Sequence, residues 1–144
     1  MPKDEGKDFI PIIISYAKPL DDFVIQELLD AAARSPTTAY EEPWVFAVIQ
    51  EQDTLKRLLD EVGVIYNADT MIVIYGKPIG PFIDSDCWLA TQNLMLAAYS
   101  MGIGSSVVSS AIPVLNTEKW KTNLEIPSDM IAIVPIIIGT SNDE

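Results

Sequence analysis

Three short segments of this chain are almost wholly apolar, at 44–49, 70–75 and 130–138. A strand with one face in water alternates polar and apolar residues, so an unbroken apolar run predicts a strand that is buried on both faces. Segments with the three- and four-residue spacing of helices separate these runs. The sequence therefore predicts a sheet that is flanked by helices, of the α/β or α+β class.

Four helical segments are predicted around these strands, at 21–34, from Asp53 onward, at 84–101 and at 113–124. Asp21 or Asp22 is a suitable N-cap for the first of them. The segment 84–101 is the longest and is apolar on nearly every side, so we expect it to lie between layers or at a subunit contact. Gly102 is placed to end that helix in the left-handed conformation. Residues 105–110 are expected to form a short strand or a loop.

The charge balance and the missing residue types exclude several functions. Nine Lys and Arg against 21 Asp and Glu give a net charge of −12, which argues against sequence-independent binding of nucleic acid and against an anionic membrane surface. The chain has no histidine, and Cys87 is its single cysteine. A cysteine-cluster metal site, a disulfide framework and the histidine-dependent catalytic triads are therefore not expected.

Length and the remaining patterns predict one domain over residues 1–144, with residues 1–8 loosely ordered. No apolar run approaches the roughly 20 residues of a spanning helix. The first residues lack the pattern of a signal peptide, so we expect a cytoplasmic protein.

Two features that look like functional motifs have a better structural interpretation. Gly102 and Gly104 follow a predicted helix, and Val107 stands where a dinucleotide-binding loop would have its third glycine. Cys87 lies one turn into the long helix beside Trp88, which favours a buried and inert thiol.

The segment between the first helix and the first strand is a stronger candidate. The helix ends at Pro36, the hydroxyl residues Thr37 and Thr38 follow, and Trp44 enters the strand. Backbone amides, two hydroxyls and a large aromatic ring suit a flat ligand with a polar edge. The alternative is an ordinary connection with Trp44 in the core, and the sequence leaves both open.

Three stretches of the chain resemble the FMN-dependent nitroreductase family. In the first, 18–46, an Ala-rich helix leads to Ser-Pro-Thr at 35–37 and to Glu-Pro-Trp at 42–44, which are similar to the family's Ala-Pro-Ser and Gln-Pro-Trp. The second, 84–105, resembles the family's central helix and its glycine-containing exit. The third, 124–139, resembles its closing Leu-x-Ile-Pro and last core strand. The resemblance covers most of residues 18–140.

The resemblance implies an intertwined homodimer built around a central mixed sheet, with two FMN molecules at the subunit interface. It implies hydride transfer from NAD(P)H through the flavin to a nitroaromatic, a quinone or a similar small-molecule acceptor. Because the flavin carries the chemistry, no catalytic side chain is expected. The cofactor-binding residues that it implies are Thr37, Thr38, Tyr40 and Glu42 at the ring, and the backbone of Val108, Ser109 and Ser110 as donors.

The chain departs from the family where the phosphate of FMN would bind. Phe9, Ile10 and Ile13 stand in place of the family's arginines, and Tyr40 and Glu42 stand in place of its Asn and Gln. The family's basic C-terminal extension is also missing. Three lost charged hydrogen bonds of about 1.5–3 kcal/mol each would weaken a nanomolar site to the micromolar or millimolar range.

Two further expectations follow from this departure. The first is a rival function, in which a cofactor-free dimer of the same fold binds a small aromatic ligand or a protein partner. The second concerns residues 9–14, which are too apolar to be left in water and are expected to add a strand to a sheet edge, of this chain or of its partner.

Overall fold

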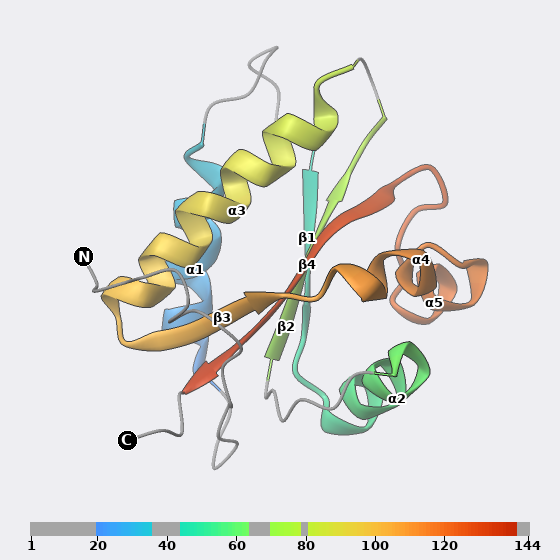
Figure 1. The fold of residues 1–144 in the computed structure, drawn as a ribbon, viewed down its shortest axis with the longest axis horizontal. Helices are drawn as coiled ribbons and strands as arrows, with labels where there is room; N and C mark the ends of the chain where they lie inside the picture. Colours follow the sequence, from blue (N-terminus) through green and yellow to red (C-terminus); the bar gives the residue numbers. More distant parts are fainter. Residues whose placement is uncertain (1–19, 36–43, 64–69, 79–80, 141–144) are drawn as a thin grey trace.

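Figure 1 shows the computed structural model of the chain, in which residues 20–35, 44–63, 70–78 and 81–140 are described. Its elements follow in the order α1 (Asp22–Ala33), β1 (Trp44–Ile49), α2 (Gln52–Val62), β2 (Thr70–Gly76), α3 (Ile83–Ser100), β3 (Ile103–Val107), a 3-10 turn (Ser109–Ala111), α4 (Ile112–Leu115), α5 (Glu118–Asn123) and β4 (Ile131–Thr140). The predictions for residues 1–8, for 9–14 and for the ring contacts Thr37, Thr38, Tyr40 and Glu42 lie outside the described residues.

The four strands form one sheet in the order β1-β2-β4-β3, and each neighbouring pair is antiparallel. The α+β class is confirmed, but the expectation of a mixed sheet is wrong for the described strands. β2 and β3, which α3 connects, do run in the same direction, yet β4 inserts between them and is antiparallel to both. Burial on both faces occurs in parallel sheets and in helix-covered antiparallel ones, so the apolar runs could not distinguish these arrangements.

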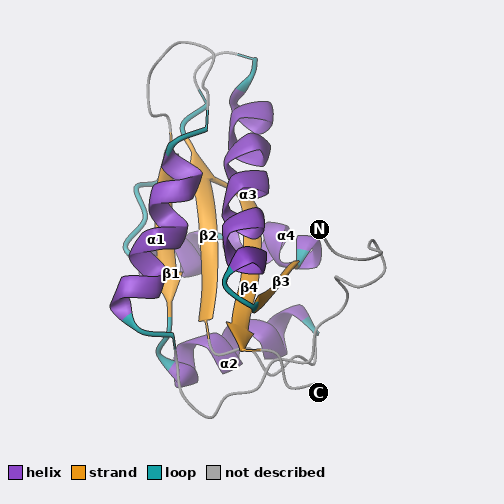
Figure 2. Cartoon of the chain, turned by 90° about the vertical axis from the view of Figure 1, so that its left-hand side faces the viewer, coloured by secondary structure: helices purple, strands orange, loops and turns teal. Residues whose placement is uncertain are grey.

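Helices cover both faces of the sheet, which explains why its central strands are apolar on both sides. Figures 1 and 2 show α1 and α3 side by side on one face, with α2, α4 and α5 on the other. Along β2, Ile72 and Ile74 belong to the core under α1 and α3, while Met71, Val73 and Tyr75 belong to the core under the other helices. This alternation is the period-two geometry of a strand, and it divides one sheet into two hydrophobic cores.

The strand β1 departs from the prediction of a fully buried strand. It is an edge strand of the described sheet, and Val45 and Val48 are 38% and 36% exposed. All seven residues of the neighbouring strand β2 are buried. Position in the sheet, rather than composition, therefore decides the burial of these two apolar strands.

The helix ends follow the predicted capping chemistry with two corrections. The carboxylate of Asp21 accepts a hydrogen bond from the backbone N–H of Val24 at 3.0 Å, so Asp21 caps α1. The cap of α2 is Glu51 rather than Asp53, because its carboxylate accepts from the backbone N–H of Thr54. The helix expected over 113–124 is divided into α4 and α5.

The helix α3 has the predicted length and end. It covers 18 residues, and Gly102, just beyond it, has a φ of +76°, the left-handed conformation that favours glycine. A second glycine, Gly76, lies where β2 meets the first turn of α3: a Cβ there would approach Cγ1 of Ile83 to 2.5 Å. None of the helices in the described part of the chain, α3 included, has the length and apolarity to cross a membrane.

Candidate functional site

The turn that follows β3 carries three of the predicted cofactor contacts, and Pro135 of β4 determines where it begins. The backbone N–H of Val108 donates to the carbonyl of Pro135 at 3.0 Å. In an antiparallel ladder Pro135 would return a hydrogen bond to the carbonyl of Val108, but proline has no N–H. That carbonyl instead accepts from the N–H of Ala111 at 3.0 Å, which closes the 3-10 turn. The ladder therefore ends at Val108, and the chain turns away from the sheet.

This geometry separates the three predicted backbone donors. The N–H of Val108 is used within the sheet, and the residue is only 4% exposed, so Val108 orients the turn instead of offering a donor. Ser109 and Ser110 are exposed, and they are the first two residues of the 3-10 turn. The first N–H groups of such a turn have no acceptor within it. The structure thus presents two adjacent backbone donors at the end of β3.

A second part of the candidate site is the exit from α1, which leads toward Thr37 and Thr38. The amide of Asn93, on α3, donates to the carbonyl of Ala31 in the last turn of α1 at 3.1 Å. Arg34 caps this helix through its backbone N–H, and Ser35 is 7% exposed. Within the described ranges, the hydroxyl of Ser35 has no hydrogen-bond partner, which is unusual for a buried polar atom. Sequence reasoning missed Asn93, because nothing local marks a contact 62 positions away.

Trp44 is a core residue, so the plainer of the two interpretations is correct for its side chain. It is 8% exposed and lies in the same hydrophobic core as Ile25, Leu28 and Ala90. Its ring stacks on that of Phe46 with 6.0 Å between the centroids. A ring that is packed in this way is not an open platform for a ligand.

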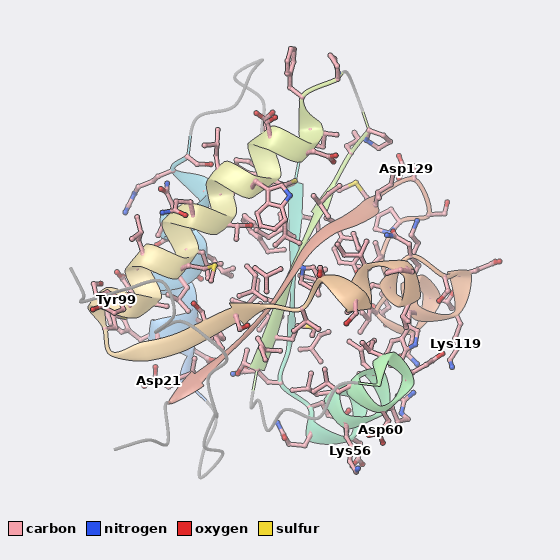
Figure 3. All side chains as sticks on the ribbon, in the orientation of Figure 1. Asp21, Lys56, Asp60, Tyr99, Lys119 and Asp129 are labelled. Atoms are coloured by element: carbon pink, nitrogen blue, oxygen red, sulfur yellow. The ribbon has the colours of Figure 1, made fainter. Side chains whose placement is uncertain are left out.

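Most of the positive charges in the described part of the chain are already engaged. Lys119 contacts Glu61 at 3.1 Å, Lys56 contacts Asp60 at 3.4 Å, and the guanidinium of Arg57 lies over the ring of Trp120. In Figure 3, Lys56, Asp60 and Lys119 lie together on the side of α2 and α5, away from Tyr99 on α3. Lys121 donates to the carbonyl of Ser128 at 3.2 Å.

Two buried groups with ionisable protons are unsuited to acid–base chemistry near neutral pH. Burial raises the pKa of the Cys87 thiol to about 12, and Asp84 and Asp86 add to the effect. Burial also raises the pKa of Tyr75 to about 12, and its hydroxyl has no hydrogen-bond partner among the residues that the structure describes. The prediction that Cys87 is buried is confirmed. Both groups remain protonated, and neither is exposed to a substrate.

Comparison with known proteins supports the sequence resemblance. The family described as "Nitroreductase family" matches residues 61–139. A protein of Archaeoglobus fulgidus is 27% identical over 133 residues, which are 87% of this chain and 76% of that protein. A protein of Methanothermobacter thermautotrophicus is 30% identical over 128 residues, 81% of this chain and 64% of that protein. Both carry the provisional name NADH dehydrogenase/NAD(P)H nitroreductase.

Solved structures share the fold. A nitroreductase with bound FMN from Bacteroides fragilis superposes with a TM-score of 0.81 at 20% identity, covering 95% of this chain and 86% of that one. A nitroreductase with bound FMN from Desulfitobacterium hafniense gives a TM-score of 0.77 at 20% identity, covering 99% and 92% of the two chains. At this level of identity the likeness concerns the fold alone.

Proposed function

Because this chain belongs to the nitroreductase family, we propose that it is a flavin-dependent oxidoreductase that moves reducing equivalents from NAD(P)H to a small-molecule acceptor. The proposed cofactor is FMN, which is bound in two of the similar solved structures. The acceptor would be a nitroaromatic, a quinone or a similar compound. The single observation that carries the proposal is that Ser109 and Ser110 are exposed residues whose N–H groups have no acceptor within their turn, at the position where the family resemblance predicts donors to the flavin ring.

The chemistry of two described residues supports binding of the FMN ring. The carbonyl oxygens and the unprotonated ring nitrogens of the oxidised flavin accept hydrogen bonds, and the N–H groups of Ser109 and Ser110 are donors without an acceptor in their own turn. The bond from Val108 to Pro135 holds these donors against the sheet, so they are oriented before a ligand arrives. Thr37, Thr38, Tyr40 and Glu42 complete the proposed ring site.

The phosphate end of FMN has weaker support among the described residues. Arg34 and Lys77 are exposed, and no contact with a carboxylate is found for them in the described ranges. Arg34 is the nearer in sequence to Thr37, so we propose it as one phosphate contact. A single arginine replaces only part of the charge that the family's arginines supply, so we expect FMN to bind at micromolar concentration or weaker.

When bound, FMN would supply the redox chemistry, taking up a hydride equivalent and passing electrons to the acceptor. The residues of the chain would bind and orient the ring and limit access of water. Tyr75 and Cys87 are buried and protonated, so we propose neither of them as an acid or base for the reaction. Protons would come from water or from the hydroxyl of Tyr40.

A homodimer is part of the same proposal, and the surface of α3 supports it. Phe82, Leu89 and Leu96 are spaced seven residues apart and are 50%, 46% and 50% exposed. Trp88 and Tyr99 extend the apolar stripe, with exposures of 45% and 41%. The sequence from Cys87 to Gly102 contains no charged residue. A seven-residue apolar repeat on one helix matches the surface that pairs with a second helix.

A cytoplasmic location completes the proposal. NAD(P)H is the reductant that we propose, and it is a cytoplasmic metabolite. The single cysteine, Cys87, is a free and buried thiol, so the described fold does not depend on an oxidising compartment.

A second candidate function has its own support. With most described lysines and arginines engaged and Trp44 in the core, a cofactor-free dimer that binds a small aromatic ligand or a protein partner also agrees with the structure. Such a protein would keep the turn at Ser109 and Ser110 for a different hydrogen-bond acceptor.

The visible spectrum of the purified protein, before and after adding FMN, separates the two functions. We expect quenching of FMN fluorescence that saturates at micromolar or higher concentration, and flavin absorption bands that shift while FMN is present in excess. Oxidation of NADH or NADPH by the loaded protein, with a quinone as acceptor, then tests the reaction. A colourless protein that quenches no FMN at millimolar concentration would reject the enzyme and favour the cofactor-free dimer.

A further inference from the structure

The outer edge of β3 is an unpaired sheet edge whose hydrogen-bonding pattern can be worked out. β3 is the last strand in the order β1-β2-β4-β3, and it pairs with β4 in the register Ser105 to Ile138. Val108 continues this register and donates to Pro135, so residues 104, 106 and 108 direct their backbone groups toward β4. The N–H and C=O groups of Ile103, Ser105 and Val107 therefore point outward. No described strand pairs with them.

One apolar segment of this chain has the composition of a missing edge strand. Residues 9–14 read Phe-Ile-Pro-Ile-Ile-Ile, with three β-branched residues in succession and no charge. Pro11 has no N–H, so a strand that contains it must turn that residue away from its neighbour and form the outermost strand. Ile10, Ile12 and Ile14 would then direct their backbone groups inward.

The position of Leu20 limits where this segment can pair. The side chain of Gln50 donates to the carbonyl of Leu20 at 3.0 Å and to the hydroxyl of Thr70 at 3.2 Å, so the chain enters α1 beside the start of β2. A strand beside β3 would lie three strand spacings from β2, about 14 Å. Six residue steps, from 14 to 20, span at most about 20 Å, so the edge of β3 is within reach.

The handedness of the connection decides between the two edges of the sheet. Figure 2 shows α1 in front of the sheet, with β1 on the left, β3 on the right and α2 at the lower end, where β1 finishes. A strand that precedes α1 and is parallel to β1 makes a right-handed crossover if it lies beyond β3, and a left-handed one if it lies beyond β1. Crossovers of this kind are right-handed in about 98% of cases.

We propose that residues 9–14 of this chain form a fifth strand on the outer edge of β3, antiparallel to it, with Ile12 opposite Ser105. The same register places Ile10 opposite Val107 and Ile14 opposite Ile103, so each inward group of the segment meets an outward group of β3. Ser105 lies on the same face of β3 as Ile103 and Val107, which pack against the core under α1 and α3, so the side chain of Ile12 would join that core. Pro11 then faces outward and prevents a further strand from adding. This proposal does not depend on flavin binding.

A disulfide between the two strands tests the pairing in the full-length protein. The residues of a hydrogen-bonded antiparallel pair lie about 5.5 Å apart at Cα, within the range of a disulfide. We expect Ile12→Cys with Ser105→Cys to form a disulfide within one chain in most molecules on oxidation. Ile13→Cys with Ser105→Cys is the matched control: its side chain lies on the opposite face, so it should not cross-link. A disulfide between two chains, no disulfide, or equal yields from the two variants would overturn the proposal.

Proline substitutions give a second and independent measurement. Ile12→Pro removes an inward N–H and Ile13→Pro an outward one, while the two changes are otherwise alike. We expect Ile12→Pro to lower the midpoint of thermal unfolding by about 5 °C or more, and Ile13→Pro to lower it by less than half as much. Equal shifts would contradict the proposed register.

Discussion

The two helical layers of this protein are stabilised in different ways. On the α2, α4 and α5 side, Trp120 is fully buried, its indole N–H donates to Glu61 at 2.8 Å, and Lys119 contacts the same carboxylate. On the α1 and α3 side, seven of the ten large apolar residues that are exposed in the described chain occur on or beside the two helices: Phe23, Phe82, Trp88, Leu89, Leu96, Tyr99 and Met101. We call the α2, α4 and α5 side the closed layer, because its large apolar residues are covered within one chain. We call the α1 and α3 side the open layer, because it leaves apolar residues exposed, and it is there that we propose the dimer contact.

The two layers also differ in how hydrogen bonds attach their helices. Asn116 adds to the closed layer by hydrogen-bonding both the N–H and the C=O of Ala132, which fixes α4 to β4. In the open layer, one side-chain hydrogen bond joins α1 to α3 in the described part, from Asn93 to Ala31, and the rest of that contact is apolar packing. We therefore expect changes in the closed layer to affect the stability of one chain, and changes in the open layer to affect assembly.

The largest expected effect is on the closed layer. Trp120→Ala removes a fully buried aromatic side chain and leaves Glu61 without its indole partner, so we expect a loss of about 3–5 kcal/mol in the free energy of unfolding. Urea denaturation followed by circular dichroism measures this loss. The matched control is Phe23→Ala on the open layer, where the ring is 70% exposed and we expect a change within about 0.5 kcal/mol. Similar losses in both variants would remove the distinction between the layers.

The second prediction concerns assembly. Leu96→Glu places a carboxylate in the α3 stripe, opposite its own copy in a two-fold dimer, and should raise the dimer dissociation constant by at least about 100-fold. Sedimentation equilibrium measures this constant. Lys56→Glu introduces the same side chain on α2, in the closed layer, and should leave the mass in solution unchanged. A wild-type protein that is a monomer at millimolar concentration would show that the stripe is not a dimer interface.

The third prediction concerns the 3-10 turn Ser109–Ala111, which follows β3. Ser109→Pro removes a backbone N–H that has no acceptor within the turn, and proline is tolerated at the first position of a helical turn. We expect FMN affinity to fall about fivefold to tenfold, the effect of one hydrogen bond, with the thermal midpoint nearly unchanged. Ser109→Ala keeps the N–H, so its affinity should equal that of the wild type in a fluorescence titration. An equal loss in Ser109→Ala would assign the contact to the hydroxyl.

The smallest expected effect is a pH dependence of the closed layer. The hydrogen bond from the indole of Trp120, followed by that from Lys119, lowers the pKa of Glu61 from its ordinary value of 4.5. A lowered pKa in the folded state stabilises the fold fully above pH 4.5, and this stabilisation is lost as the pH falls through the lower folded value. The thermal midpoint of the wild type should exceed that of Glu61→Gln at pH 7, and the difference should shrink toward pH 3. A constant difference would contradict this assignment.

The sequence predicts the elements well because their signals are local. Asp21 caps α1 as predicted, Gly102 ends α3 as predicted, and the apolar run 44–49 is a strand with those bounds. The mixed sheet was a wrong prediction because strand direction depends on which strands meet, and the apolar pattern is the same in either case. The exposure of Val45 and Val48 follows from the edge position of β1, which no local pattern reports.

The candidate site was predictable only in part, for a related reason. The resemblance predicted cofactor contacts at 108–110, but the residue at which the ladder ends depends on Pro135, which lies 27 positions beyond Val108. Asn93 was not predicted, because its partner is the backbone carbonyl of Ala31 and every residue type has such a carbonyl. The roles of Thr37, Thr38, Tyr40 and Glu42 stay predictions.

Pro135 fixes the residue at which β3 stops pairing with β4. An alanine at this position would restore an N–H that points at the carbonyl of Val108, and β3 and β4 could then pair over further residues. Ser110 would then be drawn into the ladder and its N–H used there, while the N–H of Ser109 would point outward. A single imino acid in a central strand thus determines how many residues of β3 pair with β4, and the two residues that follow leave the sheet.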